Sequence, residues 1–565
     1  MSRIIGSTLL GLLVSLAATS QVTVAPGTPQ VGSSNPVTAE PLVPRPHSRA
    51  CTVSLFQNLE FADFSAKTFT FTPPADCRGP WAKVVFTADF TVTEGRQFDR
   101  TAAFYLGHAN IYYGTTAEPS AAVSPSWHVE RDVTDLSALF KTVQTGEADL
   151  GNFVGTSGGV VYNGIIYANA ALEFYPASWD DPATPTPDVV VPLLDAEGGA
   201  TALNNTSSQL TQSVTLPTNT ERVYLDVIAQ SQSNDEFWYS CVPNDVANEL
   251  ESCGNTGFRE TEISIDGTPA GVAPVYPWIY TGGIDPYLWR PLVGVQTLDF
   301  KPYRVDLTPF AGLLADGQPH TVAISIYNAD SYFLVTANLL AYLDSCARKV
   351  TGAVTANTLS AAPTPVVTEK LTTDASGDIT GTVAVKSARS YAITGYVNTS
   401  HGRIQTTVSA TLNFSNSQNF TITAANYIQD ITQSTTVDAK TTVSDGWVSQ
   451  STETQISYPF VLNISQIGNA DGSFNLTTNA DQQDWLDVTQ KLNNFDIYTA
   501  KVRDHVTSAD TLEFNASGAL TGHTGQTASG EYAEKNSLGY CYSRAITAAG
   551  GALTAVTDGT DCRGR

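Results

Sequence analysis

Apolar and polar residues alternate along most of this chain, which is the pattern of strands with one buried face. In residues 222–230, RVYLDVIAQ, the alternation places Val223, Leu225 and Val227 on the same side. Such runs are rich in Val, Thr, Tyr, Phe and Ile and are separated by Gly, Pro, Asn and Asp. Segments with helical spacing are short. The pattern therefore predicts an all-β protein of sandwich or jelly-roll architecture.

Two stretches of different composition divide the chain of 565 residues. Residues 178–190 are rich in Pro, and residues 347–365 are small, polar and weakly periodic. They predict a first domain at 50–180, a second at 190–346 and a β-rich C-terminal domain at 366–565.

The N-terminus predicts secretion. Residues 1–20 contain a basic residue, an apolar run and small residues, as a signal peptide does. Residues 21–49 then read as a propeptide or linker, with PRPHSR as a possible processing site. No later apolar run is long enough to span a bilayer. We expect an extracellular protein without a membrane partner.

Charge and histidine spacing exclude several classes of function. The 29 basic and 54 acidic residues give a net charge of −25, which argues against a nucleic-acid partner. The seven histidines are scattered and form no ligand motif, so we expect no metal site.

Seven cysteines fit an oxidising compartment. The expected disulfides are Cys241–Cys253, Cys541–Cys562 and Cys51–Cys77, which leaves Cys346 unassigned.

Carboxylates are the remaining candidates for chemistry. Asp99 precedes Arg100 at a strand start, and Glu118 lies on a turn in TAEP. Asp235 and Glu236 stand directly before three aromatic residues in NDEFWYS. Taken singly, each of these acids is more often a surface pair or a solvated turn than a catalytic group.

An ordered set of motifs changes this interpretation. The motifs are GRQFDR, TAEP, WHVERDVTDLSALF, LPTNTERVYLDV, NDEFWYS, YTGGIDPYLWRP and DLTPFAGLLADGQPH. Together they resemble the peptide-N4-(N-acetyl-β-glucosaminyl)asparagine amidase A family of plants and fungi, over roughly residues 50–345. A more distant similarity links the chain to bacterial peptide-N-glycosidases, which implies two packed jelly rolls with carboxylates at their interface.

The resemblance assigns roles to residues. Phe98-Asp99-Arg100 is similar to the W-D-R element of the bacterial enzymes, which implies that Asp99 is the principal catalytic aspartate. By the same comparison, Glu236 is its partner from the second domain. The bacterial enzymes have a further glutamate, whose place Glu118, Glu147 or no residue takes here. The expected supporting or substrate-binding residues are Arg100, Glu118, Asp235, Trp238 and Trp289.

The resemblance implies hydrolysis of the bond between an N-linked glycan and asparagine. The substrates would be N-glycosylated peptides or proteins, the products an aspartate and a glycosylamine, and no cofactor would be needed. Two alternatives stay open at this point: a glycan-binding β-sandwich without turnover, and a glycosidase that cleaves between sugars.

Overall fold

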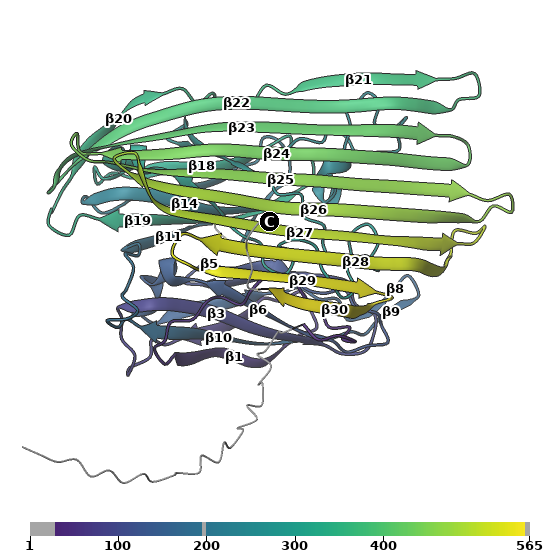
Figure 1. The fold of residues 1–565 in the computed structure, drawn as a ribbon, viewed down its shortest axis with the longest axis horizontal. Coiled ribbons are helices and arrows are strands. Elements are labelled where there is room, and N and C mark those ends of the chain that lie inside the picture. Colours follow the sequence, from purple (N-terminus) through teal and green to yellow (C-terminus); the bar gives the residue numbers. More distant parts are fainter. Residues whose placement is uncertain (1–28, 195–198, 560–565) are drawn as a thin grey trace, which may run out of the picture.

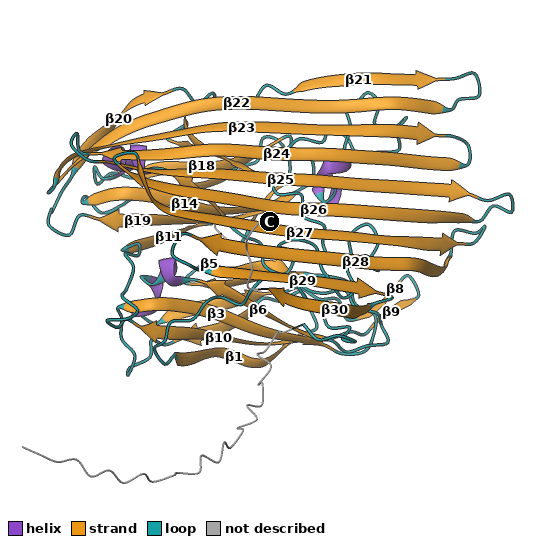
Figure 2. Ribbon diagram, in the orientation of Figure 1, coloured by secondary structure: helices purple, strands orange, loops and turns teal. Residues whose placement is uncertain are grey.

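The computed structural model describes residues 29–194 and 199–559, and nearly all of its regular structure is β-strand. The all-β fold class is confirmed (Figures 1 and 2). The only α-helix in the described residues is one turn, α1 (Ala311–Leu314). Five short 3₁₀ turns cover Thr134–Leu136, Leu139–Lys141, Ser233–Asp235, Trp238–Ser240 and Thr308–Phe310. None of the helices in these residues is long and apolar enough to cross a membrane.

Two four-stranded sheets form the first part of the fold. One has the order β1 (Cys51–Phe61), β10 (Ile166–Pro176), β3 (Trp81–Val92), β6 (Ser126–Asp132). The other has the order β2 (Lys67–Phe71), β7 (Gln144–Asp149), β4 (Thr101–Leu106), β5 (Ala109–Thr115). Their inward-facing residues form one apolar cluster, as the alternation predicts. A small hairpin, β8 (Gly155–Ser157) and β9 (Val160–Tyr162), lies beside them in the sequence.

Two further sheets form the second part. The first has the order β11 (Val189–Leu193), β19 (Phe333–Leu343), β14 (Thr220–Ser231), β17 (Tyr303–Asp306), with β12 (Thr201–Leu203) also paired to β19. The second has the order β13 (Leu210–Val214), β18 (His320–Tyr327), β15 (Glu260–Ile265), β16 (Thr268–Pro274). The division into domains at the predicted boundaries stays a prediction, because sheet boundaries do not show that each part folds alone.

The C-terminal third forms one antiparallel sheet of eleven strands, most of them unusually long. Its strands are β20 (Thr351–Asn357), β21 (Val366–Thr373), β22 (Ile379–Thr399), β23 (Gly402–Ile422), β24 (Asn426–Ser444), β25 (Ser449–Gly468), β26 (Phe474–Leu492), β27 (Phe495–Phe514), β28 (Leu520–Asn536), β29 (Cys541–Ala549) and β30 (Ala552–Gly559). Figure 1 shows this sheet lying across the strands of the second part. One apolar cluster contains residues of both, so the large sheet is packed on the second part rather than tethered to it.

Residues 29–49, which belong to the expected propeptide or linker, pack against the rest of the fold. Val37 is buried and pairs with Leu292, and Arg45 makes an ion pair of 2.6 Å with Glu130. Backbone hydrogen bonds also join this segment to β30. The predicted signal peptide, residues 1–20, lies outside the described residues.

Two of the expected disulfides are confirmed, Cys51–Cys77 and Cys241–Cys253. Cys346 is exposed and its thiol is unpaired. The expected partner of Cys541, Cys562, lies outside the described residues.

Candidate active site

Asp99 and Glu118 lie together at the open end of the β4–β5 hairpin. The two strands are in antiparallel register, and just beyond them Arg100 and Thr116 continue the pairing through backbone and hydroxyl hydrogen bonds of 2.8 and 2.9 Å. One step further out, the backbone N–H of Asp99 donates to Glu118 Oε2 at 3.2 Å. A residue before β4 and a residue after β5 thus place two carboxyl groups side by side.

A loop of the second part covers this pair from the other side. The backbone N–H of Gly282 donates to Asp99 Oδ2 at 2.9 Å. A Cβ at position 282 would overlap the Glu118 carboxylate, so only glycine permits this approach. Arg290 Nε donates to the backbone oxygen of Glu118 at 2.8 Å, and its Nη2 lies 3.9 Å from Glu118 Oε1.

Glu236 reaches the site from the end of β14. Inside that strand, Gln230 Nε2 donates to Thr101 Oγ1 at 3.0 Å, which fixes β14 against β4 across the interface. The Tyr280 hydroxyl donates to the backbone oxygen of Ser231 at 2.5 Å, where the strand ends. The chain then turns, and Glu236 follows this anchored end, partly exposed.

The three carboxyl groups act on one another electrostatically. Burial, then the charges of Asp99 and Glu118, raise the pKa of Glu236 to about 7. Burial and the charge of Asp99 raise the pKa of Glu118 to about 7, against the opposing effect of Arg290 and Arg100. Burial also raises the pKa of Asp99, while the Gly282 N–H and Arg100 favour its ionised form. Both glutamates are therefore partly protonated at neutral pH.

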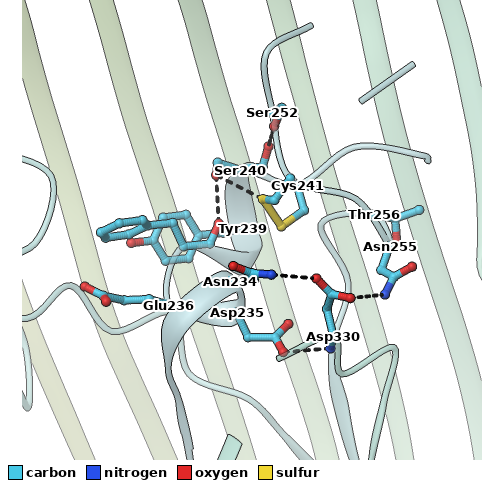
Figure 3. Close-up of a disulfide and its surroundings, with 12 residues drawn as sticks. Asn234, Asp235, Glu236, Tyr239, Ser240, Cys241, Ser252, Asn255, Thr256 and Asp330 are labelled. Atoms are coloured by element: carbon cyan, nitrogen blue, oxygen red, sulfur yellow. Dashed lines mark hydrogen bonds between the residues drawn. A yellow bond between two sulfur atoms is a disulfide. The ribbon is translucent and has the colours of Figure 1, made fainter. Parts of the chain in front are cut away.

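Asp235, the neighbour of Glu236, has a different place. Its side chain is fully buried and lies against the equally buried Arg259, whose Nε donates to it at 2.9 Å. It also accepts the backbone N–H groups of Asp330 and Ser331 at 2.7 and 2.8 Å. Figure 3 shows Asp235 and Glu236 pointing apart. Of the two roles expected for Asp235, support and substrate binding, only support fits, because its carboxylate is enclosed and used in the fold.

Loss of this buried ion pair is expected to destabilise the protein strongly. Asp235→Asn would leave Arg259 charged and unpaired in the interior, at a cost of roughly 3–5 kcal/mol of unfolding free energy. Urea unfolding followed by tryptophan fluorescence measures it. Asp63→Asn, which breaks an exposed pair with Lys67, is the control and is expected to leave the urea midpoint almost unchanged. Equal midpoints for both variants would contradict a structural role for Asp235.

The two tryptophans expected at the site are also core residues. Trp238 is 0 % exposed and packs against Tyr239 and Phe414, the latter from the large sheet. Trp289 is 2 % exposed, and its Nε1 donates to the backbone oxygen of Gly283 at 3.1 Å. Neither ring is open to a sugar, because apolar contacts cover both.

An exposed aromatic surface does lie next to Asp99. Phe98 is 37 % exposed, and its ring centroid is 5.3 Å from that of Tyr162 on β9. The guanidinium carbons of Arg96 and Arg100 lie 5.9 and 5.7 Å from the centre of the Phe98 ring. Sequence reasoning named Phe98 only as part of a motif and missed Tyr162, since nothing in the sequence brings the β8–β9 hairpin to this loop.

Sequence reasoning also missed Gly282 and Arg290, although both stand in YTGGIDPYLWRP. The two adjacent glycines were a usable signal, since they permit close backbone approach. Glu147, the alternative third acid, lies on β7, where it is opposite Tyr105 and Thr68. Within residues 29–194 and 199–559, no group of three or more His, Cys, Asp or Glu side chains is arranged to hold a metal ion.

Three neighbouring carboxyl groups, two of them with pKa values raised to about 7, can supply the acid and the base that hydrolysis of an amide requires. The family model of peptide N-acetyl-beta-D-glucosaminyl asparaginase amidase A matches residues 41–360, and the chain belongs to this family. Peptide-N4-(N-acetyl-beta-glucosaminyl)asparagine amidase A of Prunus dulcis is 32% identical over 396 residues, which cover 66% of this chain and 67% of the relative. The resemblance recognised in the motifs is confirmed.

The chain is also similar to solved structures. PNGase F, a glycosylasparaginase from Flavobacterium meningosepticum, has 16% sequence identity and a TM-score of 0.35, over 53% of this chain and 97% of that chain. PNGF-II has 13% identity and a TM-score of 0.36, over 52% of this chain and 65% of that chain.

Proposed function

We propose that the protein hydrolyses the amide bond between an N-linked glycan and the asparagine side chain, and that Asp99, Glu118 and Glu236 carry the reaction. The observation that supports these residues is their position. The open end of the β4–β5 hairpin and the end of β14 bring together three partly exposed carboxyl groups, and their charges shift one another's pKa values. Family membership supports the choice of bond.

Asp99 is the general base in this proposal. Its carboxylate removes a proton from a water molecule, whose oxygen attacks the carbonyl carbon of the glycosylated asparagine. The Gly282 N–H and the charge of Arg100 favour the ionised form that a base needs. The tetrahedral intermediate carries a negative charge, and Arg100 is the cation beside Asp99 that offsets it.

The glutamates supply the proton for the leaving group. An amide nitrogen departs only when it is protonated, so a carboxylic acid beside it lowers the barrier. With pKa values near 7, Glu118 and Glu236 share protons at neutral pH, whereas ordinary glutamates would be ionised. Collapse of the intermediate breaks the carbon–nitrogen bond and leaves an aspartate on the peptide and a glycosylamine.

Phe98 and Tyr162 offer the sugar an apolar face. Sugar rings present C–H groups that aromatic planes cover well, and this surface begins one residue before Asp99. It takes the place that Trp238 and Trp289 had in the sequence-based prediction.

Mass spectrometry of a defined glycopeptide tests the activity. The expected products are the whole glycan and a peptide in which Asp replaces the glycosylated Asn. A sugar left on Asn would show a glycosidase, and an intact glycopeptide that nevertheless binds would show a glycan-binding protein. Either result would overturn the proposed amidase reaction.

We also propose that the protein is secreted. Two disulfides in the described residues and the signal-like composition of residues 1–20 support an oxidising, extracellular location.

A further inference from the structure

The loop that covers the carboxylates rests on the large C-terminal sheet. We call residues 282–290 the covering loop. Ser508 Oγ of β27 donates to the backbone oxygen of Leu288 at 2.7 Å, and Gln526 Nε2 of β28 donates to the backbone oxygen of Arg290 at 3.2 Å. Residues more than 200 positions apart in the sequence therefore meet where the large sheet contacts the covering loop.

A chain of three side chains leads from that sheet to Glu118. His523 of β28 stacks on Tyr287, with ring centroids 3.7 Å apart and an angle of 18° between the rings. The guanidinium carbon of Arg290 lies 4.8 Å from the centre of the Tyr287 ring. Arg290 in turn contacts Glu118, through the backbone oxygen at 2.8 Å and the carboxylate at 3.9 Å.

Buried acids fix both ends of the stacked pair. The Tyr287 N–H donates to Asp285 Oδ1 at 2.9 Å, and His523 Nδ1 lies 3.1 Å from Asp510 Oδ1 on β27. Asp285 and Asp510 are 0 % and 2 % exposed. Burial, then the nearby Asp510 carboxyl, raise the pKa of Asp285 to about 7, so Asp285 is partly protonated at neutral pH.

We propose that His523 is a positioning residue for the deglycosylation reaction: it supports Tyr287, which holds Arg290 against Glu118. The large sheet is then part of the active-site framework and not an appended domain. This inference rests on the proposed function, because it assigns a task to Arg290 in a reaction that uses Glu118.

Loss of the His523 support is expected to change the pKa of Glu118 in one direction. The groups whose charges act on Glu118 are Asp99, which raises its pKa, and Arg290 and Arg100, which lower it. Glu118 in turn raises the pKa of Glu236. If Arg290 moves away, one of the two cations is lost and the pKa of Glu118 rises. A support that acted only on folding would leave that pKa unchanged.

The His523→Ala variant of the whole chain tests the positioning role of His523. We expect kcat for glycan release to fall about tenfold and the alkaline limb of the pH–rate profile to move to higher pH, with little change in melting temperature. His523→Phe keeps a ring against Tyr287 and is expected to restore kcat and the profile. His505→Ala is the matched control, because His505 lies on β27 and contacts Asp481 at 3.0 Å, so it is not part of the chain from His523 through Tyr287 to Arg290.

Hydrogen exchange of residues 282–290 gives a second measurement that does not need activity. Faster exchange in His523→Ala than in His505→Ala or His523→Phe supports the positioning role. Unchanged exchange overturns it, as does a pH–rate profile in His523→Ala that matches the active wild type. An inactive wild type overturns the proposed function, while the exchange comparison still decides whether His523 positions the loop.

Discussion

Replacement of Asp99 by asparagine is expected to lower the rate of glycan release by about 10²- to 10⁴-fold, the usual contribution of a general base. Asparagine keeps the size of the side chain and an oxygen that can accept the Gly282 N–H, so the covering loop should stay in place. What is lost is the charge that removes a proton from water. Initial rates on a defined glycopeptide, followed by mass spectrometry, measure the effect.

The control must separate chemistry from folding. Asp226→Asn removes another aspartate from the same interface region, on β14, where Asp226 pairs with Arg304 at 2.7 Å. It should leave the rate close to that of the wild type. Asp99→Asn should also bind the glycopeptide with almost unchanged affinity. A folded Asp99→Asn enzyme that released glycan at the wild-type rate would refute the proposed base, even though the fold would stand.

Local patterns explain why much of this fold could be predicted. In β14 the residues Val223, Leu225 and Val227 are buried as the alternation requires, because side chains in a strand point to opposite faces in turn. Asp99 and Glu236 became candidates for a different reason. Each lies in a short motif at a strand end, and the order of those motifs along the chain is specific.

The errors arose where tertiary packing decides. NDEFWYS gives no sign that Asp235 meets Arg259 while Glu236 points elsewhere, since Arg259 is 24 residues further along the chain. From the sequence, Trp238 was expected either to support the acids or to offer a sugar an apolar face. It is instead covered by Phe414 from the large sheet, a contact that no local pattern contains.

The contacts of the covering loop at the candidate active site also could not be predicted from local sequence patterns. Gly282 reaches Asp99 from 183 positions away, and its importance lies in the side chain that it lacks. The sequence predicted a β-rich domain at 366–565, but it does not reveal that Ser508 and His523 contact the covering loop. The packing of a sheet against a distant loop depends on the shapes of both surfaces. The residue pattern of a single strand does not give those shapes.

Glu118→Gln is expected to lower glycan release about 10²-fold and to shift the alkaline limb of the pH–rate profile to lower pH. The loss of rate follows from removing one of the two acids that protonate the leaving nitrogen. The shift follows from charge: ionised Glu118 helps to raise the pKa of Glu236 to about 7, so a neutral glutamine lets Glu236 lose its proton at lower pH. Activity that needs protonated Glu236 then disappears earlier as pH rises.

Glu147→Gln is the matched control, because Glu147 is the other acid that the sequence offers for the third position. It lies on β7 and is expected to change neither the rate nor the profile. Kinetics of kcat/KM between pH 4 and 10 distinguish the two variants. A large loss in Glu147→Gln, or a Glu118→Gln profile with an unmoved alkaline limb, would contradict the assignment of Glu118. The direction of the shift is the decisive observation, because a merely damaged site would lower the rate without moving the pH at which a second carboxyl group titrates.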